Sequence, residues 1–473
     1  MTNIGVLGAG QLGRMLALAG YPLGHRFRFF DPASDSPASL LADHLAFDYA
    51  DTSALEQFAQ GLDVVTYEFE NVPVEAVRHL EKFVPVYPPP IALEKAQDRF
   101  VEKSFFRELG IPTPKYSTDG FAKRINGYET DEGNGLEADA RIVSTDGFAK
   151  RISGYETDEG NGLEADARIV STDGFAKRIS GYETDEGNGL EADARIVSTD
   201  GFAKRISGYE TDEGNGLEAD ARINSTDGFA KRISGYETDE IEFPVVLKTR
   251  RMGYDGKGQM VVSSQAGLEN GLGNGETDGL IIEEFVPFDR ELSIICVRNR
   301  SGETKFYPLI ENQHRDGILR LSLVTGNVSA DLQGQAEEYA TRVMSALNYI
   351  GVLTIEFFEK GGRLLANEMA PRVHNSGHWT IEGAVTSQFE NQVRAVTDAS
   401  LGSTSPLGAC AMVNLVGTLP DVEFILKIEG AHLHLYDKAP RPKRKLGHIT
   451  LVEKDVEMLY EKLNEIRKVY DQF

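Results

Sequence analysis

The sequence has 473 residues, 41% of them hydrophobic, and a formal net charge of −25. This length allows about three domains with packed cores, and the charge argues against a nucleic-acid-binding surface, which needs clustered lysines and arginines. No apolar run reaches the roughly 18 residues of a membrane span, and the chain starts in a strand-like run without a basic leader. We therefore expect a cytoplasmic enzyme without nucleic-acid or membrane partners, in which Cys296 and Cys410 are buried, inert thiols.

The first motif is "IGVLGAGQLGRM" at residues 4–15, where Gly8, Gly10 and Gly13 follow an apolar run. Asp31 closes the next apolar run, 18 residues after Gly13. This G-x-G-x-x-G order is typical of a dinucleotide-binding turn at the start of a helix. Taken alone the motif is a weak signal, and it leaves a nicotinamide or flavin enzyme open.

The first 95 residues alternate between strand and helix patterns. Strands are predicted over 3–10, 26–32, 62–73 and 84–90, and helices over 11–24, 52–61 and 74–83. This alternation indicates an open parallel α/β sheet with ligands at the carboxyl ends of its strands. One long helix is then predicted over 92–114, ended by Gly110 and Pro112.

A tandem repeat of period 27 occupies residues 117–240, with four near-identical copies and a partial fifth. Each copy has six acidic and three basic side chains and few large apolar ones, a composition that favours a flexible segment. A calcium site or a partner-binding array are alternatives, although the acidic residues miss the EF-hand spacing. We interpret the repeat as an in-frame duplication in a surface loop, which costs little loop-closure entropy.

A second glycine loop follows in "FPVVLKTRRMGYDGKGQMVV", between two strand-like runs. Gly253, Gly256 and Gly258 would let backbone N–H groups approach a phosphate, and Lys248 would add a positive charge. The loop lacks the Walker pattern, and a flexible hairpin is the alternative. In the next strand pair, Glu283 and Glu284 precede an apolar pair that suits an adenine-sized slot.

The hairpin "GVLTIEFFEKGGRLLANEMA" places Glu356 and Glu368 on neighbouring strands. Cross-strand partners lie about 5 Å apart, and two buried carboxylates repel each other unless a cation is shared between them. Magnesium takes such oxygen ligands together with nucleotide phosphates, so the hairpin is a candidate metal site, with a solvent-facing pair as the alternative. Directly downstream, polar side chains crowd into a candidate substrate pocket: Arg372, His374, Asn375, Ser376 and His378.

Five motifs in order carry a family resemblance: "GAGQLGRM" with "YEFENVP", "LKTRRMGYDGKGQ", "EEFVPFDRELS", "NEMAPRVHNSGHWT" and "RPKRKLGHIT". The chain resembles the ATP-grasp ligases, specifically the N5-carboxyaminoimidazole ribonucleotide synthetases of purine biosynthesis, over residues 1–116 and 241–473. The resemblance implies an α/β and α+β fold. It implies a Rossmann-like domain at 1–95, an ATP-grasp domain at 96–385 interrupted by the repeat at 117–240, and a C-terminal domain at 386–473.

The resemblance also implies an activity. ATP would phosphorylate bicarbonate to carboxyphosphate, and the carboxylate would pass to the amine of 5-aminoimidazole ribonucleotide. ATP and Mg²⁺ would be the cofactors, and a homodimer the assembly. Arg372, Lys248 and Lys257 would serve catalysis by stabilising charge, and the glycine loop would act as a lid.

Residue by residue, the resemblance assigns metal ligation to Glu356 and Glu368. It assigns ATP binding to Arg99, Lys248, Gly253, Tyr254, Asp255, Gly256, Lys257, Gly258, Gln259, Glu283, Glu284, Phe285, Val286, Glu291, His314, Asn367 and Glu368. It assigns the ribonucleotide to Gly10, Gln11, Leu12, Glu68, Asn71, Asp255, His374, Asn375, Ser376, Lys438, Arg441, Arg444 and Lys445. The first glycine turn would then hold the substrate's phosphate rather than a dinucleotide.

The chain departs from the family pattern in two places. The repeat falls within the small ATP-grasp subdomain, and Lys443 stands where a small residue is expected. Three alternatives stay open: a related ATP-grasp ligase using another acyl donor such as formate, an NAD-dependent oxidoreductase, and a scaffold protein whose acidic repeat is its working part.

Overall fold

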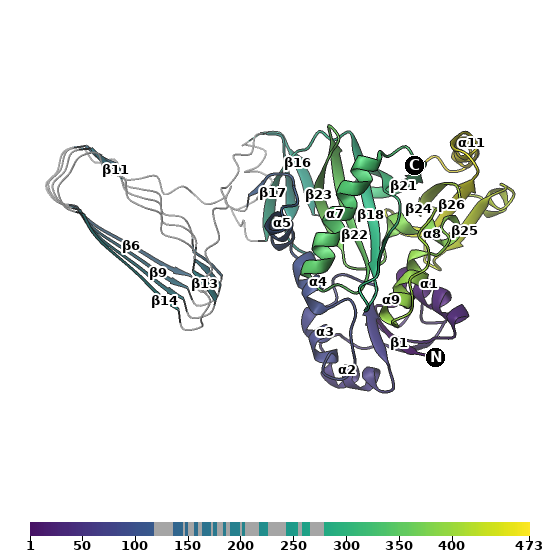
Figure 1. Cartoon of the computed structure of the whole chain (residues 1–473), viewed down its shortest axis with the longest axis horizontal. Coiled ribbons are helices and arrows are strands. Elements are labelled where there is room, and N and C mark those ends of the chain that lie inside the picture. Colours follow the sequence, from purple (N-terminus) through teal and green to yellow (C-terminus); the bar gives the residue numbers. More distant parts are fainter. Residues whose placement is uncertain are drawn as a thin grey trace. The chain divides into compact units, whose positions relative to one another are not determined.

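The computed structural model describes residues 1–117, 243–253, 258–264 and 279–473, together with strand segments inside the repeat (Figure 1). Contacts divide the chain into two compact units, residues 1–118 with 240–473, and residues 119–239. The α-helices in the described part of the first unit are α1 (Gln11–Gly20), α2 (Thr52–Ala59), α3 (Val74–Leu80), α4 (Pro90–Ala96), α5 (Arg99–Glu108), α7 (Ala330–Ala346), α8 (Thr380–Gly383), α9 (Gln388–Val396), α10 (Val422–Ile425) and α11 (Val456–Arg467).

The N-terminal region forms a four-stranded parallel sheet in the order β3-β2-β1-β4. Its strands are β1 (Asn3–Leu7), β2 (Arg26–Phe30), β3 (Asp43–Leu45) and β4 (Val64–Tyr67). Strands β1 and β4 are mostly apolar and almost fully buried, as is typical of parallel strands covered on both faces. Strands β2 and β3 contain charged residues and are partly exposed. The predicted α/β alternation is confirmed, but β3 was missed and residues 84–90 contribute only an isolated bridge at Val86.

The prediction of one long helix over 92–114 is wrong, because the chain forms α4 and α5 there. Asp98 has an extended backbone and accepts hydrogen bonds from the N–H groups of Phe100 and Val101, at 3.0 and 3.4 Å. An aspartate in this position caps a new helix by satisfying its first free donors. The cap makes Arg99 the first residue of α5, which positions it for the site below.

The described strands after the repeat belong to two sheets, the smaller of which also contains β5 from before the repeat. The smaller has the order β16-β15-β17-β5, from β5 (Tyr116–Ser117), β15 (Val245–Thr249), β16 (Gln259–Val262) and β17 (Leu280–Glu284). The larger has nine strands in the order β23-β22-β18-β20-β21-β24-β26-β25, with β19 on β18. These are β18 (Arg290–Arg298), β19 (Thr304–Phe306), β20 (Ile310–Arg315), β21 (Ile318–Val324), β22 (Gly351–Lys360), β23 (Arg363–Ala370), β24 (Ala409–Val416), β25 (Ala431–Leu435) and β26 (Lys445–Glu453).

Helices cover the larger sheet and bury its apolar face. Helix α7 packs across β18 and β22 (Figure 1), and its Leu332, Ala340 and Val343 join a core with Phe357. Towards the C-terminal part, α11 packs on β24 and β26 around a second core. Both cysteines are free and buried, as expected, and burial raises the pKa of the Cys410 thiol to about 12.

Within the repeat, equivalent strands pair in parallel with a register offset equal to the repeat length. The strands β6 (Leu136–Ser144), β9 (Leu163–Ser171), β12 (Leu190–Ser198) and β14 (Leu217–Ser225) form one sheet. Two further sheets contain β7 (Gly147–Ala149), β10 (Gly174–Ala176) and β13 (Gly201–Ala203), and β8 (Glu156–Asp158) and β11 (Glu183–Asp185). The interpretation of this segment as a flexible duplicated insertion stays a prediction.

Candidate active site

Two glutamates interrupt the apolar pattern of the β22–β23 hairpin. Glu356 and Glu368 are direct partners across the antiparallel ladder, with a register irregularity just after Glu356. Their side chains are 18% and 39% exposed, respectively. The predicted cross-strand juxtaposition of the two residues is thus confirmed.

The two carboxylates differ in their pKa values. Burial, and then the charge of Glu368, raise the pKa of Glu356 to about 7. Burial alone would raise the pKa of Glu368 too, but the Arg99 guanidinium, together with the charges of Lys248 and Lys103, outweighs burial and lowers that pKa. Opposite pKa shifts are expected when two carboxylates share a site and a cation neutralises only one of them.

Arg99 reaches the hairpin from the first turn of α5. Its NH1 donates to Glu368 Oε2 at 2.8 Å, and its NH2 donates to the Gly253 carbonyl at 3.4 Å. Asp98, the cap of that helix, also accepts from the Arg250 guanidinium at 2.8 Å. The start of α5 therefore contacts both the β22–β23 hairpin and the residues at which the second glycine loop begins.

A buried cluster of two lysines and one glutamate lies next to Asn367. The Lys248 ammonium is 2.7 Å from Glu283 Oε2, and the Lys103 ammonium is 3.3 Å from the same oxygen. Lys103 Nζ also donates to the Asn367 carbonyl at 3.1 Å, and Lys248 Nζ to Asn367 Oδ1 at 3.4 Å. Burial lowers the pKa of Lys103, and the two lysines together lower the pKa of Glu283 against the effect of its own burial.

Sequence reasoning missed Lys103 and its neighbour Glu102. The Glu102 carboxyl accepts from the Met369 N–H at 2.6 Å, and burial, with the charge of Glu368, raises its pKa well above the usual range. Both residues lie one turn from Arg99, so charged residues at i+3 and i+4 in a helix with an apolar face were the available signal.

The second glycine loop is described only at its two ends. Tyr254, Asp255, Gly256 and Lys257 lie outside the described residues. Gln259 pairs with Lys248 across the β15–β16 ladder, and the preceding Gly258 has a φ of 73°. A Cβ at Gly258 would lie 2.4 Å from Thr249 Oγ1, so both the backbone conformation and the close approach require glycine there.

Glu291 and His314 meet on neighbouring strands of the large sheet. His314 Nδ1 is 2.9 Å from Glu291 Oε2. Burial opposes protonation of His314, but this bond and the charges of Glu356 and Glu291 together outweigh burial and raise its pKa. On β17, Glu284 accepts from the Lys115 N–H at 3.3 Å. Directly after it, Phe285 is exposed and Val286 is buried.

Arg372, the candidate for stabilising carboxyphosphate, forms an ion pair with Glu70. Its NH1 donates to the Val373 carbonyl at 2.9 Å, and its buried Nε has no hydrogen-bond partner in the described part of the chain. Glu70 lies in the same "YEFENVP" run as the predicted Glu68 and Asn71 but was not singled out. The run contains two glutamates, and its pattern gave no means of deciding which carboxylate faces the arginine.

The polar run after β23 folds into a short 3₁₀ turn, Asn375–Gly377. His374 Nδ1 is 2.8 Å from the Ser376 hydroxyl, and its Nε2 is 3.3 Å from Glu356 Oε1. Burial, followed by the charge of Arg372, lowers the pKa of His374 well below its usual range. The ring is therefore neutral near pH 7, and Asn375 is paired with Asn414 at 2.7 and 3.0 Å.

Glu68 occupies the first glycine turn. Gly10 and Gly13 donate their N–H groups to its carboxylate at 2.8 and 3.2 Å, and Ala9 donates to Asp31 at 3.0 Å. In this conformation the two acids take donors that the pyrophosphate of a dinucleotide would need. This arrangement disfavours the nicotinamide hypothesis, and it gives Glu68 a structural role beside the ribonucleotide contact predicted for it.

The basic segment, residues 438–445, has side chains that approach both the first glycine turn and the acidic hairpin. Lys438 Nζ donates to Gln11 Oε1, next to the buried Leu12. The charge of Lys445 lowers the pKa values of both Glu356 and His374, so it faces the acidic hairpin. The other predicted ribonucleotide residues, Arg441, Arg444 and Asn71, are exposed or half-buried.

A divalent cation fits the chemistry of the hairpin. Among the described residues no group of three or more His, Cys, Asp or Glu side chains could hold a metal ion. Magnesium needs no such group, since it is bound through one or two carboxylates together with waters and substrate phosphates. Burial, and then the charge of Glu368, raise the pKa of Glu356, and a cation shared by the two carboxylates would offset both effects.

The described residues include no helix long and apolar enough to cross a bilayer.

Three family models match the chain: a ribonucleotide synthetase preATP-grasp domain at residues 1–97, an ATP-grasp domain at 230–389, and a phosphoribosylaminoimidazole carboxylase C-terminal domain at 410–462. The predicted fold class is confirmed by these matches.

Similar proteins cover nearly the whole chain. The N5-carboxyaminoimidazole ribonucleotide synthase of Pseudomonas aeruginosa is 38% identical over 469 residues, with 99% of each chain covered. The crystal structure of the corresponding synthetase from Thermus thermophilus is 40% identical, with a TM-score of 0.71 and 99% of each chain covered. An ADP complex of another such synthetase is 28% identical, with a TM-score of 0.69, covering 98% of this chain and 96% of its own.

Proposed function

Because this chain belongs to the N5-carboxyaminoimidazole ribonucleotide synthase family, we propose how its residues divide the reaction between them. It is an ATP-dependent carbon–nitrogen ligase of purine biosynthesis. It carboxylates 5-aminoimidazole ribonucleotide with bicarbonate and releases ADP and phosphate. The observation that carries the residue assignments is the Glu356–Glu368 pair with Arg99 bound to one member.

The ATP phosphates are assigned to the positive groups beside Asn367. Lys248 lies on the strand that leads into the glycine loop, and its ammonium group is 2.7 Å from Glu283. This ion pair holds the ammonium group in place, so it would be in position to bind phosphates that enter the loop. Lys103 supports that charge from the buried side of Glu283. The Gly253–Gln259 loop would close over the nucleotide, and Glu291 with His314 would face its ribose.

Glu356 and Glu368 would hold a magnesium ion together with phosphate oxygens. When bound, the ion would neutralise charge that builds up on the transferring phosphoryl group. Glu368 is kept ionised by Arg99, whereas Glu356 has to lose a proton near neutral pH before it can act as a ligand. Loading of the metal is therefore coupled to proton release.

Arg372 is assigned to bicarbonate and to the carboxyphosphate formed from it. Phosphoryl transfer needs positioning and charge stabilisation more than covalent help. The ion pair with Glu70 fixes one side of the guanidinium, and its free Nε leaves a donor for an incoming oxyanion. Exclusion of water by the loop would protect carboxyphosphate from hydrolysis.

The ribonucleotide is assigned to the surface between the first glycine turn and the basic segment. Lys438 already contacts Gln11, which marks where these two regions meet. Arg444 and Lys445 would bind the substrate's phosphate, and neutral His374 would face its base. A homodimeric assembly and a cytoplasmic location stay predictions.

The test is ADP release by the full chain, with bicarbonate and 5-aminoimidazole ribonucleotide supplied separately and together. We expect turnover only when both are present with Mg-ATP. Formate in place of bicarbonate would sustain turnover if another acyl donor were used. An absorbance change at the nicotinamide band would instead support an oxidoreductase.

A further inference from the structure

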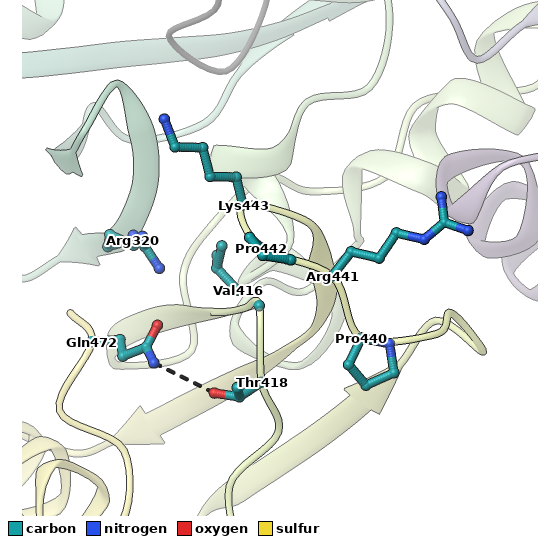
Figure 2. A pocket seen from close by; sticks show the side chains of 9 residues that line it. Arg320, Val416, Thr418, Pro440, Arg441, Pro442, Lys443 and Gln472 are labelled. Atoms are coloured by element: carbon teal, nitrogen blue, oxygen red, sulfur yellow. Dashed lines mark hydrogen bonds between the residues drawn. The ribbon is translucent and has the colours of Figure 1, made fainter.

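A cavity of about 370 Å³ lies outside the residues assigned to ATP and magnesium (Figure 2). It is bounded by the end of β24, by the loop of residues 440–443 and by Gln472. Its lining residues are Arg320, Val416, Gly417, Thr418, Pro440, Arg441, Pro442, Lys443 and Gln472. The lining has three cationic side chains and no acidic one, and Asp471, beside Gln472, is exposed and does not line it.

Arg320 is the buried cation of this cavity. It is 8% exposed, and its Nε and NH1 have no hydrogen-bond partner within the described residues. It hydrogen-bonds the Tyr470 hydroxyl, which is not an acidic group that would balance its charge. A buried guanidinium without a counter-ion is costly unless something else pairs with it.

A β-bulge accounts for the direction of Arg320. Strands β20 and β21 pair Gln313 with Leu321 and His314 with Leu319, so Arg320 has no partner on β20. A bulge of this kind redirects a side chain relative to its neighbours on the strand. It turns Arg320 towards Tyr470 and the cavity, so the charge is placed there by the backbone.

Lys443 adds a second observation. Its φ is 62°, in the left-handed region that favours glycine, although it is an ordinary residue with a long side chain. Backbone strain of this kind persists where the surroundings hold the residue in place, and it occurs at ligand-binding positions. Lys443 and Arg320 thus line the same cavity, and the backbone conformation of Lys443 is one that its surroundings must hold in place.

The geometry points to a binding site for a phosphate-class anion in this cavity. The Arg320 guanidinium has two donors without a partner among the described residues, Nε and NH1, on different edges of the group, and Lys443 adds a point charge. Gln472 donates to the Thr418 hydroxyl at 3.4 Å, and both residues supply neutral polar groups to the lining. Of the lining residues only Arg441 was also assigned to the ribonucleotide, and Figure 2 shows it extending from the loop away from Arg320.

This inference does not depend on the ligase mechanism proposed above. Because residues 440–443 belong to the basic segment, an anion in the cavity would hold that segment in its observed conformation. The ligand chemistry is shared by two sources, free inorganic phosphate and the phosphate ester of a sugar phosphate. An anion that binds only the folded chain raises its unfolding temperature in a saturable way.

The test is thermal unfolding of the full chain at constant ionic strength, with Mg-ADP and 5-aminoimidazole ribonucleotide at saturation so that their sites are filled. Titration with inorganic phosphate should then raise the midpoint by about 3 °C and reach a plateau. Arg320→Met and Lys443→Gly should each reduce this shift at least about threefold. The matched control Lys454→Gly removes an exposed lysine outside the cavity and should keep the full shift.

Lys443→Gly keeps the test decisive if Arg320→Met fails to fold, because glycine accepts the observed backbone conformation.

Ribose 5-phosphate is titrated in parallel. An equal shift supports a site open to phosphate esters, and a shift with inorganic phosphate alone supports a site for the free ion. Absence of a saturable shift in the wild type, or equal shifts in the wild type and Lys443→Gly, would overturn the inference. Neither outcome depends on ADP release, so the proposed function is judged separately.

Discussion

Glu356 and Glu368 face each other across the β22–β23 ladder, yet only Glu368 is paired with an arginine. The Arg99 guanidinium holds one carboxylate ionised, and the other has a pKa raised to about 7. The pair therefore carries one permanent negative charge and one that depends on pH and on a bound cation. This asymmetry underlies the first two predictions below.

The metal assignment predicts that Glu368→Gln lowers kcat by about 100-fold or more, because a carboxylate ligand and the partner of Arg99 are lost together. The far-ultraviolet spectrum and the unfolding midpoint should stay close to wild type, since Glu368 is 39% exposed. Steady-state ADP release at several magnesium concentrations checks this. A variant with near-normal rates would remove Glu368 from the metal site.

The pKa of Glu356 predicts a pH-dependent stability in the metal-free chain. Because the folded-state pKa is raised from 4.5 to about 7, this residue stabilises the fold below pH 4.5, and that contribution is lost as pH rises through about 7. The loss is on the order of 3 kcal/mol. Urea unfolding should show wild type losing stability relative to Glu356→Gln between pH 5 and 8. A constant difference between the two would contradict the shift.

Arg444→Ala should raise the KM for the ribonucleotide about tenfold or more, the effect of losing one hydrogen bond to a charged group. The KM for ATP should change less than about twofold, because the nucleotide residues lie on other elements. Lys427→Ala, which removes an exposed lysine outside the site, is the control. Equal effects on both substrates would argue that Arg444 supports the fold of the loop instead.

Deletion of residues 117–224 should leave turnover within about threefold of wild type. The deletion joins Tyr116 to Ser225, which replaces Ser117 with the same residue, so the pairing of β5 with Ile282 on β17 can form again. The rest of the chain is a compact unit by itself. A deletion variant that folds but has lost turnover would show that the repeat takes part in function.

The sequence was sufficient to predict elements whose signal is local. Alternating strands and helices in residues 1–95 and the glycine turn of the β22–β23 hairpin both follow from short-range patterns. The cross-strand placement of Glu356 and Glu368 followed from the hairpin alone. The break between α4 and α5 was missed because an apolar pattern continues through Asp98, whose capping role depends on its own backbone conformation.

The long-range contacts of the site could not be predicted in this way. Lys103 pairs with Glu283, and Glu70 pairs with Arg372, from elements far apart in the sequence. Glu68 was predicted as a ligand residue, and only the structure shows its carboxylate receiving the Gly10 and Gly13 N–H groups. Such pairings depend on how elements pack together, which periodicity and spacing do not specify.

Diffraction from crystals grown with Mn²⁺ and ADP would test the proposed site most directly, because manganese can be located by its anomalous signal. We predict a peak between the carboxylates of Glu356 and Glu368, with the diphosphate near Lys248 and the closed glycine loop. A peak elsewhere with these side chains turned apart, or a nucleotide seated on the Gly8–Gly13 turn, would contradict the proposal.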